Sequence, residues 1–495
     1  MMAWCKWVAR RDVRSLKWSE AVHPVRRPAF AAGVVPLRRG LRIAAALLVL
    51  PMLSVTPNVH ADPADPAFEE HCPEPDPNCW SDQSRYHAFY TPPNPLPGQP
   101  GALIRSEAQD GIRLEPSGQL GSWVAHATRI MYVSTDARHN PVAETGTYLE
   151  PNDPWPGPGP RPLIAYAASP LGLGDHCAES RLLDQGVHFS SGQDLMLNLD
   201  EGFLATMVAR GFAVVVSDGT GVGTPGPVPF LIRDASGPPL LDAARAAMQL
   251  PGTSLHPHGP VALWGWSANG GQASADAAEI AADYAPDLNV VGAWSGAPAA
   301  DPTLLPPFVD GNVFLVALGW VLNGVLAAYP EAAPVLAPTL APRGQDLVSR
   351  SASMCLVEGL WDFGFRHLVP WDQFLGHGYF NTDPYQLFSS DPVHSILAAQ
   401  RLGTRKPAVP VMLESNRWDP FMPWGGVRQL AQDWCDKGAD VQLWTNYQTP
   451  FFEKMAIFNH VLPWWVDGER SMAWIADRFN GQPTTPNCQE IPNIQ

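Results

Sequence analysis

The sequence predicts an α/β protein built on a doubly wound, mostly parallel sheet, and three observations predict it. Short apolar runs recur along the chain without the polar alternation of a half-exposed strand, which indicates strands buried on both faces. Helix-like segments separate these runs, as in sheets whose helices cover both faces. The 495 residues, of which 45% are hydrophobic, are enough to bury such a core, and 53 Pro and 42 Gly indicate many turns.

The first predicted elements come in the order strand, helix, strand. Residues 162–167 (PLIAYA) form a short apolar run, and we expect a buried strand there. The segment 204–210 has helical character and is stopped by Gly211, a common helix end. Residues 212–217 (FAVVVS) are rich in β-branched valine, which predicts a second strand ended by the Asp-Gly pair that follows.

The alternation continues through the middle of the chain. The segment 240–250, rich in leucine and alanine, predicts a helix, and residues 261–264 (VALW) predict a strand. A run of small residues over 273–285 predicts a helix, and residues 289–294 (NVVGAW) predict a strand. Near the C-terminus the pattern returns as strand, helix and strand, at 409–413, 426–438 and 441–444.

Residues 303–395 break this alternation. They contain the apolar stretch 313–329, and seven aromatic residues crowd positions 361 to 380. An insertion of this kind between sheet strands predicts a mainly helical cap domain. Two interpretations stay open: a second buried helical layer, or a lid that lines an apolar binding site.

The first 61 residues differ in kind from the rest. They carry ten Lys/Arg and only two Asp/Glu, followed by the apolar run Ile43–Leu53 and the site Val59-His60-Ala61. A basic region, a short apolar region and a small-x-small site are typical of a secretory signal peptide. The run is too short for an ordinary membrane span, although an uncleaved anchor is the alternative. We therefore expect a secreted protein, with the cell envelope as the alternative location.

The charge of the chain excludes some partners. The net charge is −16, and it becomes −24 without residues 1–61, which hold ten of the 32 basic and two of the 48 acidic residues. Such an acidic surface gives no support for binding nucleic acid or anionic membranes. We expect no nucleic-acid partner and no stable membrane span once the signal is cleaved, and the oligomeric state stays open.

Six cysteines follow the predicted signal, an even number that fits export. Three disulfides are expected, and fifteen connectivities are open. Zinc is the alternative, but the sequence has neither a Cys-x-x-Cys nor a His-x-x-x-His cluster, so we expect no metal and no cofactor. The disulfide candidates are Cys72, Cys79, Cys177, Cys355, Cys435 and Cys488.

The chain is thus expected to have five parts. They are a signal peptide at 1–61, an N-terminal extension at 62–109, the first part of an α/β core at 110–302, the cap at 303–395 and the second part of the core at 396–495.

The stretch 263-LWGWSANGG-271 contains a candidate nucleophile. A serine hydroxyl attacks well when a histidine takes its proton and an acid orients that histidine. In α/β-hydrolases the serine occupies a tight turn between strand and helix, and serine, acid and histidine follow in that order. Ser267 lies between the predicted strand 261–264 and the predicted helix 273–285, with Gly265 two residues before it.

The second glycine of this motif is missing, because Asn269 stands two residues after Ser267. We interpret the substitution as tolerated for two reasons. Asparagine accepts a positive φ better than most residues. Gly270 and Gly271 follow directly, where they relieve the packing of the turn.

The base and the acid are predicted from chain order. Four histidines follow Ser267, and only His460 comes after the last large strand–helix unit. Asp419 follows the predicted strand 409–413 and precedes a turn, so it is the predicted acid, with Glu414 as the alternative. A satisfied core histidine and a helix-capping aspartate are the structural alternatives for these two positions.

An acyl-transfer site also needs N–H donors for the oxyanion. One should be that of Ala268, directly after the nucleophile. The other should come from Ser169, in the loop 168-ASPLGLG-174 after the first predicted strand. A plain Gly/Pro turn is the alternative for this loop.

Further motifs resemble those of a known family. The strongest is 214-VVVSDGTGVGTP-225, and the others are 241-LDAARAA-247, 175-DHCAES-180, 296-GAPAAD-301, 433-DWC-435 and 474-WIADRF-479. In these motifs the chain resembles the secretory lipases of the lipase A type, α/β-hydrolases of yeasts and actinobacteria, over about residues 110–485.

The resemblance implies a nucleophile at Ser267, an acid at Asp419 and a base at His460. It also implies a cap in the 303–395 region and a disulfide from Cys177 to Cys355. Two departures stand out: Asn269 in the turn, and an Ala-Ser-Pro loop where many bacterial relatives have a His-Gly-Thr-like loop.

These observations together predict a secreted serine carboxylic ester hydrolase with an α/β-hydrolase fold, which acts on acylglycerols or similar apolar esters in lipid catabolism. The predicted mechanism forms an acyl-enzyme and needs no cofactor. Two alternatives stay open. The same triad could transfer the acyl group to an alcohol or sugar, or the fold could be catalytically silent and serve for binding.

Overall fold

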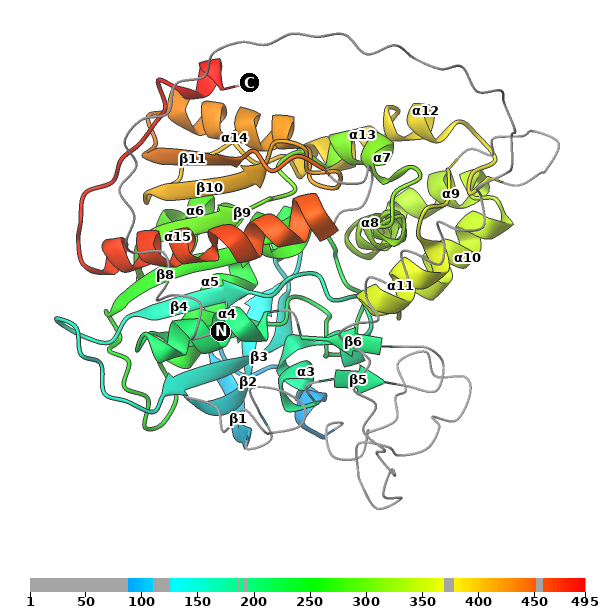
Figure 1. The fold of residues 1–495 in the computed structure, drawn as a ribbon. Helices are drawn as coiled ribbons and strands as arrows, with labels where there is room; N and C mark the ends of the chain where they lie inside the picture. The colour runs from blue at the N-terminus through cyan, green and yellow to red at the C-terminus, as the bar shows by residue number, and fades with distance from the viewer. Residues whose placement is uncertain are drawn as a thin grey trace, which may run out of the picture. The chain divides into compact units, whose positions relative to one another are not determined.

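The computed structural model describes residues 88–109, 112, 125–185, 187–189, 195–198, 200–368, 378–450 and 457–494 (Figure 1). All of them belong to the second of two units of the chain, Pro63–Gln495. The predicted signal peptide, Cys72 and Cys79 lie outside the described residues. Within the described part, no helix is both long and apolar enough to cross a membrane.

A mixed sheet of nine strands forms the centre of the fold, in the order β1-β2-β3-β7-β4-β8-β9-β10-β11. The strands from β7 to β11 pair in parallel, and the predicted strands all fall within this part. The bounds are β1 Leu103–Gln109, β2 Ala125–Thr135, β3 Pro141–Pro151, β4 Leu163–Ala167, β7 Ala213–Ser217, β8 Pro260–Trp266, β9 Asn289–Gly296, β10 Val411–Asn416 and β11 Val441–Asn446. A separate pair, β5 Val187–Phe189 and β6 Leu195–Leu197, is antiparallel.

The antiparallel strands β1, β2 and β3 were not among the predicted strands. They extend the sheet beyond β7, and β1 falls within the segment 62–109 that the sequence suggested as an extension. β1 lies at the sheet edge, where six of its seven residues remain partly or fully exposed, so it lacks the apolar run that marked the central strands.

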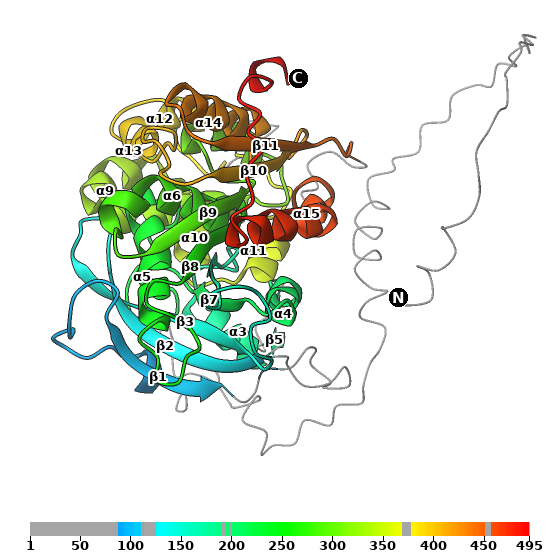
Figure 2. The same ribbon diagram turned by 90° about the vertical axis from the view of Figure 1, so that its left-hand side faces the viewer.

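Helices cover both faces of the sheet (Figure 2). On one face lie α5 Gly237–Ala247, α6 Gln272–Tyr284 and α14 Trp424–Asp436, and on the other lie α3 Glu179–Gln185, α4 Glu201–Ala209 and α15 Leu462–Phe479. Strand side chains point alternately into the two layers. Leu263 packs with the first set of helices, whereas its neighbours Ala262 and Trp264 pack with the second. The doubly wound prediction is confirmed.

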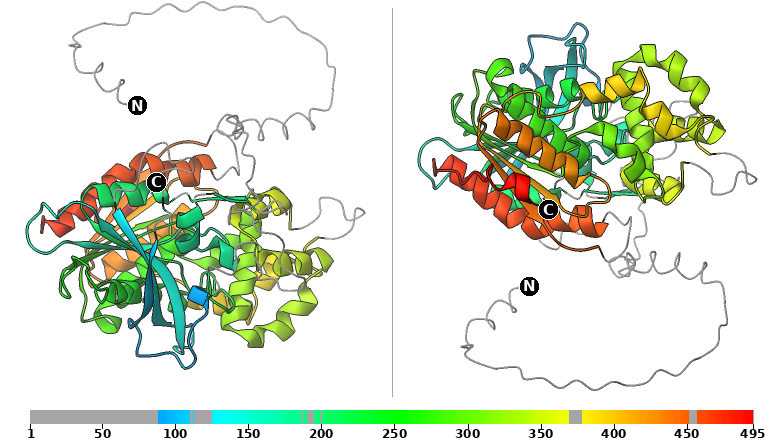
Figure 3. Two further views of the ribbon diagram at one scale, coloured as in Figure 1. Left: turned by 90° about the horizontal axis from the view of Figure 1, so that it is seen from below. Right: turned by 90° about the horizontal axis from the view of Figure 1, so that it is seen from above.

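A helical insertion separates β9 from β10 and lies beside the sheet (Figure 3). Its backbone meets the core at a short bridge between Gly172 and Cys355. Its helices are α7 Leu305–Val309, α8 Val316–Ala328, α9 Ala333–Leu336, α10 Pro342–Ser351, α11 Leu356–Phe363, α12 Pro384–Phe388 and α13 Val393–Ala399. The fold is that of an α/β-hydrolase with an inserted helical cap, as predicted.

Candidate active site

Ser267 lies in a sharp turn between β8 and α6. It is the first residue of a π-helical turn, Ser267–Gly271, that leads directly into α6. Its φ is +69°, a left-handed backbone conformation that residues other than glycine rarely adopt. Backbone strain of this kind is held by the surrounding structure and is typical of a nucleophile turn at a strand end.

Crowding explains where the glycines of this turn stand. A Cβ atom at Gly265 would overlap the carbonyl oxygen of Gly270, and one at Gly271 would overlap that of Gly296. A Cβ atom at Gly270 would stand 2.6 Å from the carbonyl oxygen of Ala167. The turn is therefore tight at positions 265, 270 and 271.

Asn269 occupies a roomier position in the same turn. It is partly exposed and lines a small cavity with Ser169, Asp218 and Gly219. Its φ is not positive, so the interpretation that asparagine was chosen for a left-handed backbone is wrong: the left-handed residue is Ser267. In the usual motif the crowded position lies two residues after the serine, at 269. In this π-helical turn it lies three residues after the serine, at Gly270, so position 269 has room for a side chain.

The structure brings Ser267, His460 and Asp419 together in one chain of hydrogen bonds. Ser267 Oγ lies 2.7 Å from His460 Nε2, and His460 Nδ1 lies 2.7 Å from Asp419 Oδ2. The other oxygen of Asp419 accepts hydrogen bonds of 2.8 Å from the backbone N–H groups of Phe421 and Met422. The carboxylate is thereby held by the loop that carries it.

This chain of side chains is enclosed. Ser267 is 5% exposed, Asp419 4% and His460 2%. Aromatic rings surround the imidazole: the ring centroids of Trp266 and Phe421 lie 5.6 Å and 5.4 Å from that of His460. Low exposure strengthens the electrostatic interaction between the imidazole and the carboxylate.

Glu414, the alternative acid, does not reach His460. It lies on β10 and is fully buried, and its burial, with Asp467 nearby, raises its pKa well above the usual value. The alternation of the strand directs it towards Trp294 and α15, whereas Asp419 stands in the loop beyond the strand end.

The oxyanion prediction at Ser169 disagrees with the structure. The Ser169 N–H donates to Asp200 Oδ2 at 3.1 Å, and its hydroxyl donates to Asp200 Oδ1 at 3.0 Å. Asp200 is fully buried and also accepts a hydrogen bond of 2.7 Å from Tyr166. A donor that already satisfies a buried carboxylate is not free for an oxyanion. Ala268, the other predicted donor, is fully buried directly after Ser267.

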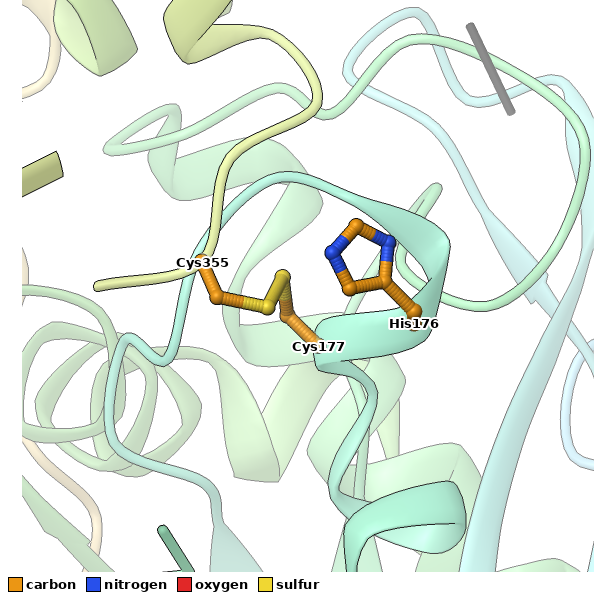
Figure 4. Close-up of side chains that lie close together, drawn as sticks. All are labelled: His176, Cys177 and Cys355. Atoms are coloured by element: carbon orange, nitrogen blue, oxygen red, sulfur yellow. A yellow bond between two sulfur atoms is a disulfide. The ribbon is translucent and has the colours of Figure 1, made fainter. Parts of the chain in front are cut away.

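Among the described residues, two disulfides join four of the six predicted cysteines. Cys177 pairs with Cys355 and ties the loop before α3 to the cap at α11, and Cys435 pairs with Cys488 and ties α14 to the C-terminal segment. His176 stands beside the first disulfide (Figure 4), and its ring nitrogen and the two sulfurs lie within 4.8 Å of one another. Because the sulfurs are bonded to each other, they offer no thiolate to a metal in this state.

Three residues at the site were missed by the sequence analysis. Asp200 accepts hydrogen bonds from the backbone and side chain of Ser169. It lies just before α4, and no sequence motif there indicated this role. Asn416 and Asn459 bridge the loops that carry the acid and the base. A buried-amide role for Asn459 could have been suspected from its place directly before His460.

A serine in a strand–turn–helix, followed along the chain by an aspartate and then a histidine, is the arrangement typical of α/β-hydrolases. The sequence profile of the family named Secretory lipase matches residues 188–487, and the chain belongs to this family. Membership confirms the resemblance and the prediction of a carboxylic ester hydrolase of the lipase/esterase class.

Individual relatives are distant. The chain is 27% identical over 399 residues to a probable inactive lipase of Mycobacterium tuberculosis, which covers 80% of this chain and 82% of that protein. It is 26% identical over 344 residues to a secreted triacylglycerol lipase of Malassezia furfur, covering 67% and 84%. Candida antarctica lipase A in its closed state matches the fold with a TM-score of 0.65 at 22% identity, covering 80% and 87% of the two chains.

Proposed function

We propose that this protein is an exported lipase that hydrolyses apolar carboxylic esters through an acyl-enzyme on Ser267. The observation that carries the proposal is the chain of hydrogen bonds from Ser267 through His460 to Asp419. Two further features support it: the strained turn at Ser267, and the position of His460 between Ser267 and a buried carboxylate.

In the proposed mechanism, Ser267 Oγ attacks the ester carbonyl carbon while His460 Nε2 takes the hydroxyl proton. Asp419 stabilises the positive charge that develops on the imidazole, and the N–H of Ala268 donates to the oxyanion. Collapse of the tetrahedral intermediate breaks the ester bond, and His460 returns the proton to the leaving alcohol. Water then attacks the acyl-enzyme by the same steps and releases the acid.

An apolar cavity under the cap supports a fatty acyl substrate. It is lined by apolar residues from the core and the cap, among them Phe230, Val309, Leu318 and Phe388. Phe421 also lines it, and the ring of Phe421 contacts that of His460. The cavity has room for only about one water, about 10 Å³, so an alkyl chain would have to part the cap from the core. The chain would then bury its surface between the two, at about 0.8 kcal/mol per methylene. The proposal thus assigns the cap a substrate-binding role.

Export is supported by the basic and apolar pattern of residues 1–61 and by the two disulfides, which persist in oxidising compartments. N-terminal sequencing of the protein recovered from the culture medium would test it. A chain that stays in the cytoplasm with its first residues intact would contradict it.

Activity needs a direct test, because one relative is described as a probable inactive lipase. A fluorophosphonate probe should label the folded wild type and leave Ser267→Ala unlabelled. Hydrolysis should extend to long-chain p-nitrophenyl esters and to a triacylglycerol emulsion.

Turnover of short esters alone would refute the lipase assignment. A well-folded wild type that is not labelled would point to a silent binding protein. Ester products formed with an added alcohol would reveal acyl transfer.

A further inference from the structure

Two buried asparagines connect the loops that carry Asp419 and His460. Asn416 is the last residue of β10, three positions before Asp419, and Asn459 directly precedes His460. Asn416 is fully buried, and Asn459 is 1% exposed. Neither side chain has a part in the proposed proton transfers.

The amide of Asn416 holds both loops at once. Its Oδ1 accepts a hydrogen bond of 2.8 Å from the backbone N–H of Trp418 and one of 3.3 Å from Asn459 Nδ2. The Asn416 backbone carbonyl also accepts from the Asp419 N–H at 3.2 Å. One residue therefore fixes the backbone on the N-terminal side of the acid and touches the neighbour of the base.

The end of a second strand, β11, closes this network. The backbone carbonyl of Gln448, just beyond β11, accepts from Asn459 Nδ2 at 2.6 Å and from Asn416 Nδ2 at 3.0 Å. Asn416 Nδ2 also donates to Asn446 Oδ1 at 2.9 Å, and Gln448 Nε2 donates to the Phe458 carbonyl at 3.1 Å. The loop before His460 is thus joined to two strand ends by neutral groups.

Buried amides joined in this way resist movement. Separating them would leave donors and acceptors without partners away from water, at about 1–3 kcal/mol for each group. Because the groups are neutral, they hold the acid and the base without adding a charge next to the imidazole. A displacement of about 1 Å between catalytic groups can lower a rate about 100-fold.

We infer that Asn416 and Asn459 are positioning residues, which set the distance between Asp419 and His460 for the reaction. The inference rests on the proposed serine hydrolase function. It predicts that loss of either amide lowers kcat and leaves KM nearly unchanged, because neither residue lines the apolar cavity.

The test compares Asn416→Ala, Asn459→Ala and the double variant with Asn487→Ala. Asn487 makes a pair of side-chain bonds to the Leu443 backbone, in the middle of β11 rather than at its end. We expect kcat to fall about 10- to 100-fold in each single variant, with KM within about two-fold. Because both amides belong to one hydrogen-bond network, the double variant should lose little more than the worse single variant. Asn487→Ala should keep wild-type kcat.

A second measurement does not depend on turnover. The Nδ1 proton of His460 in its hydrogen bond to Asp419 should give a far-downfield proton NMR signal in the wild type and in Asn487→Ala. The signal should broaden or vanish in Asn459→Ala, which keeps the Trp418 bond and should fold even if Asn416→Ala does not. Wild-type kcat and an unchanged signal in folded Asn459→Ala would overturn the inference. A wild type that shows the signal but is never labelled by fluorophosphonate would refute the proposed function instead.

Discussion

Gly265 and Gly270 meet backbone to backbone across the turn that carries Ser267, so closely that a Cβ atom at Gly265 would overlap the carbonyl oxygen of Gly270. Neither of these glycines has a positive φ. The requirement for glycine at these positions is therefore one of space. The only left-handed residue of the turn is Ser267 itself.

Substitutions in the turn should show whether its glycines are needed to avoid steric overlap or to allow an unusual backbone conformation. Gly265→Ala should destabilise the fold by about 2 kcal/mol or more and abolish fluorophosphonate labelling, because backbone rather than a flexible side chain blocks the new methyl group. Asn269→Gly should lose at most about 1 kcal/mol and keep most activity. Thermal unfolding and labelling rates measure both. A stable, active Gly265→Ala would contradict the crowding seen here.

The two candidate acids should behave differently. Asp419→Asn should lower kcat by about 10⁴-fold, because the amide cannot stabilise the imidazolium or hold its tautomer. Glu414→Gln should keep activity within a few-fold, because burial raises the pKa of Glu414 well above its usual value and so favours the neutral carboxyl, which the amide resembles. Steady-state kinetics on one soluble ester would decide. A larger loss in Glu414→Gln would reverse the assignment.

The two disulfides form a matched pair for testing the cap. Removing either by a double Cys→Ser substitution should cost about 2–4 kcal/mol of stability. Only the Cys177–Cys355 bridge joins the cap to the loop that follows Ser169, so only its loss should also change the KM for long-chain esters. Denaturant unfolding and kinetics with short and long esters check this. Equal KM values in both double variants would show that the bridge does not shape the acyl site.

Glu144 on β3 should make stability depend on pH. It is fully buried, and this burial raises its pKa to about 8. In the unfolded chain it ionises near pH 4.5, so the folded state holds the extra proton between these values and stability falls as pH rises, by about 1.4 kcal/mol per pH unit. Above pH 8 this loss is complete.

The substitution Glu144→Gln should remove this pH dependence of the free energy of unfolding. Its Tm should rise relative to the wild type between pH 5 and pH 8 and then stay level, whereas the exposed control Glu469→Gln should follow the wild-type curve. Parallel Tm curves for Glu144→Gln and the wild type would contradict the buried neutral carboxyl.

The parallel part of the sheet was predictable because most of its strands are apolar on both faces. Every residue of β4, β7 and β10 is buried. The predicted segment 261–264 lies within β8, and 289–294 lies within β9. The antiparallel strands at the other end were missed because the edge strand β1 is mostly exposed, and because β3 joins the parallel strands by pairing with β7, a segment far from it in the sequence. Prediction at Ser169 failed for a similar reason, since Asp200 lies far from it in sequence and no local pattern links the two.

The sequence by itself determined the α/β class, the central strands and the chain order of Ser267, Asp419 and His460. These features follow from local runs of apolar residues and from which residue types can perform the chemistry. Only the tertiary structure decided which acid meets the histidine, which N–H groups are already engaged, and which glycines are crowded. Those outcomes depend on contacts between strand ends and turns far apart in the chain, where a shift of one residue, as in the π-helical turn at Ser267, changes which side chain fits.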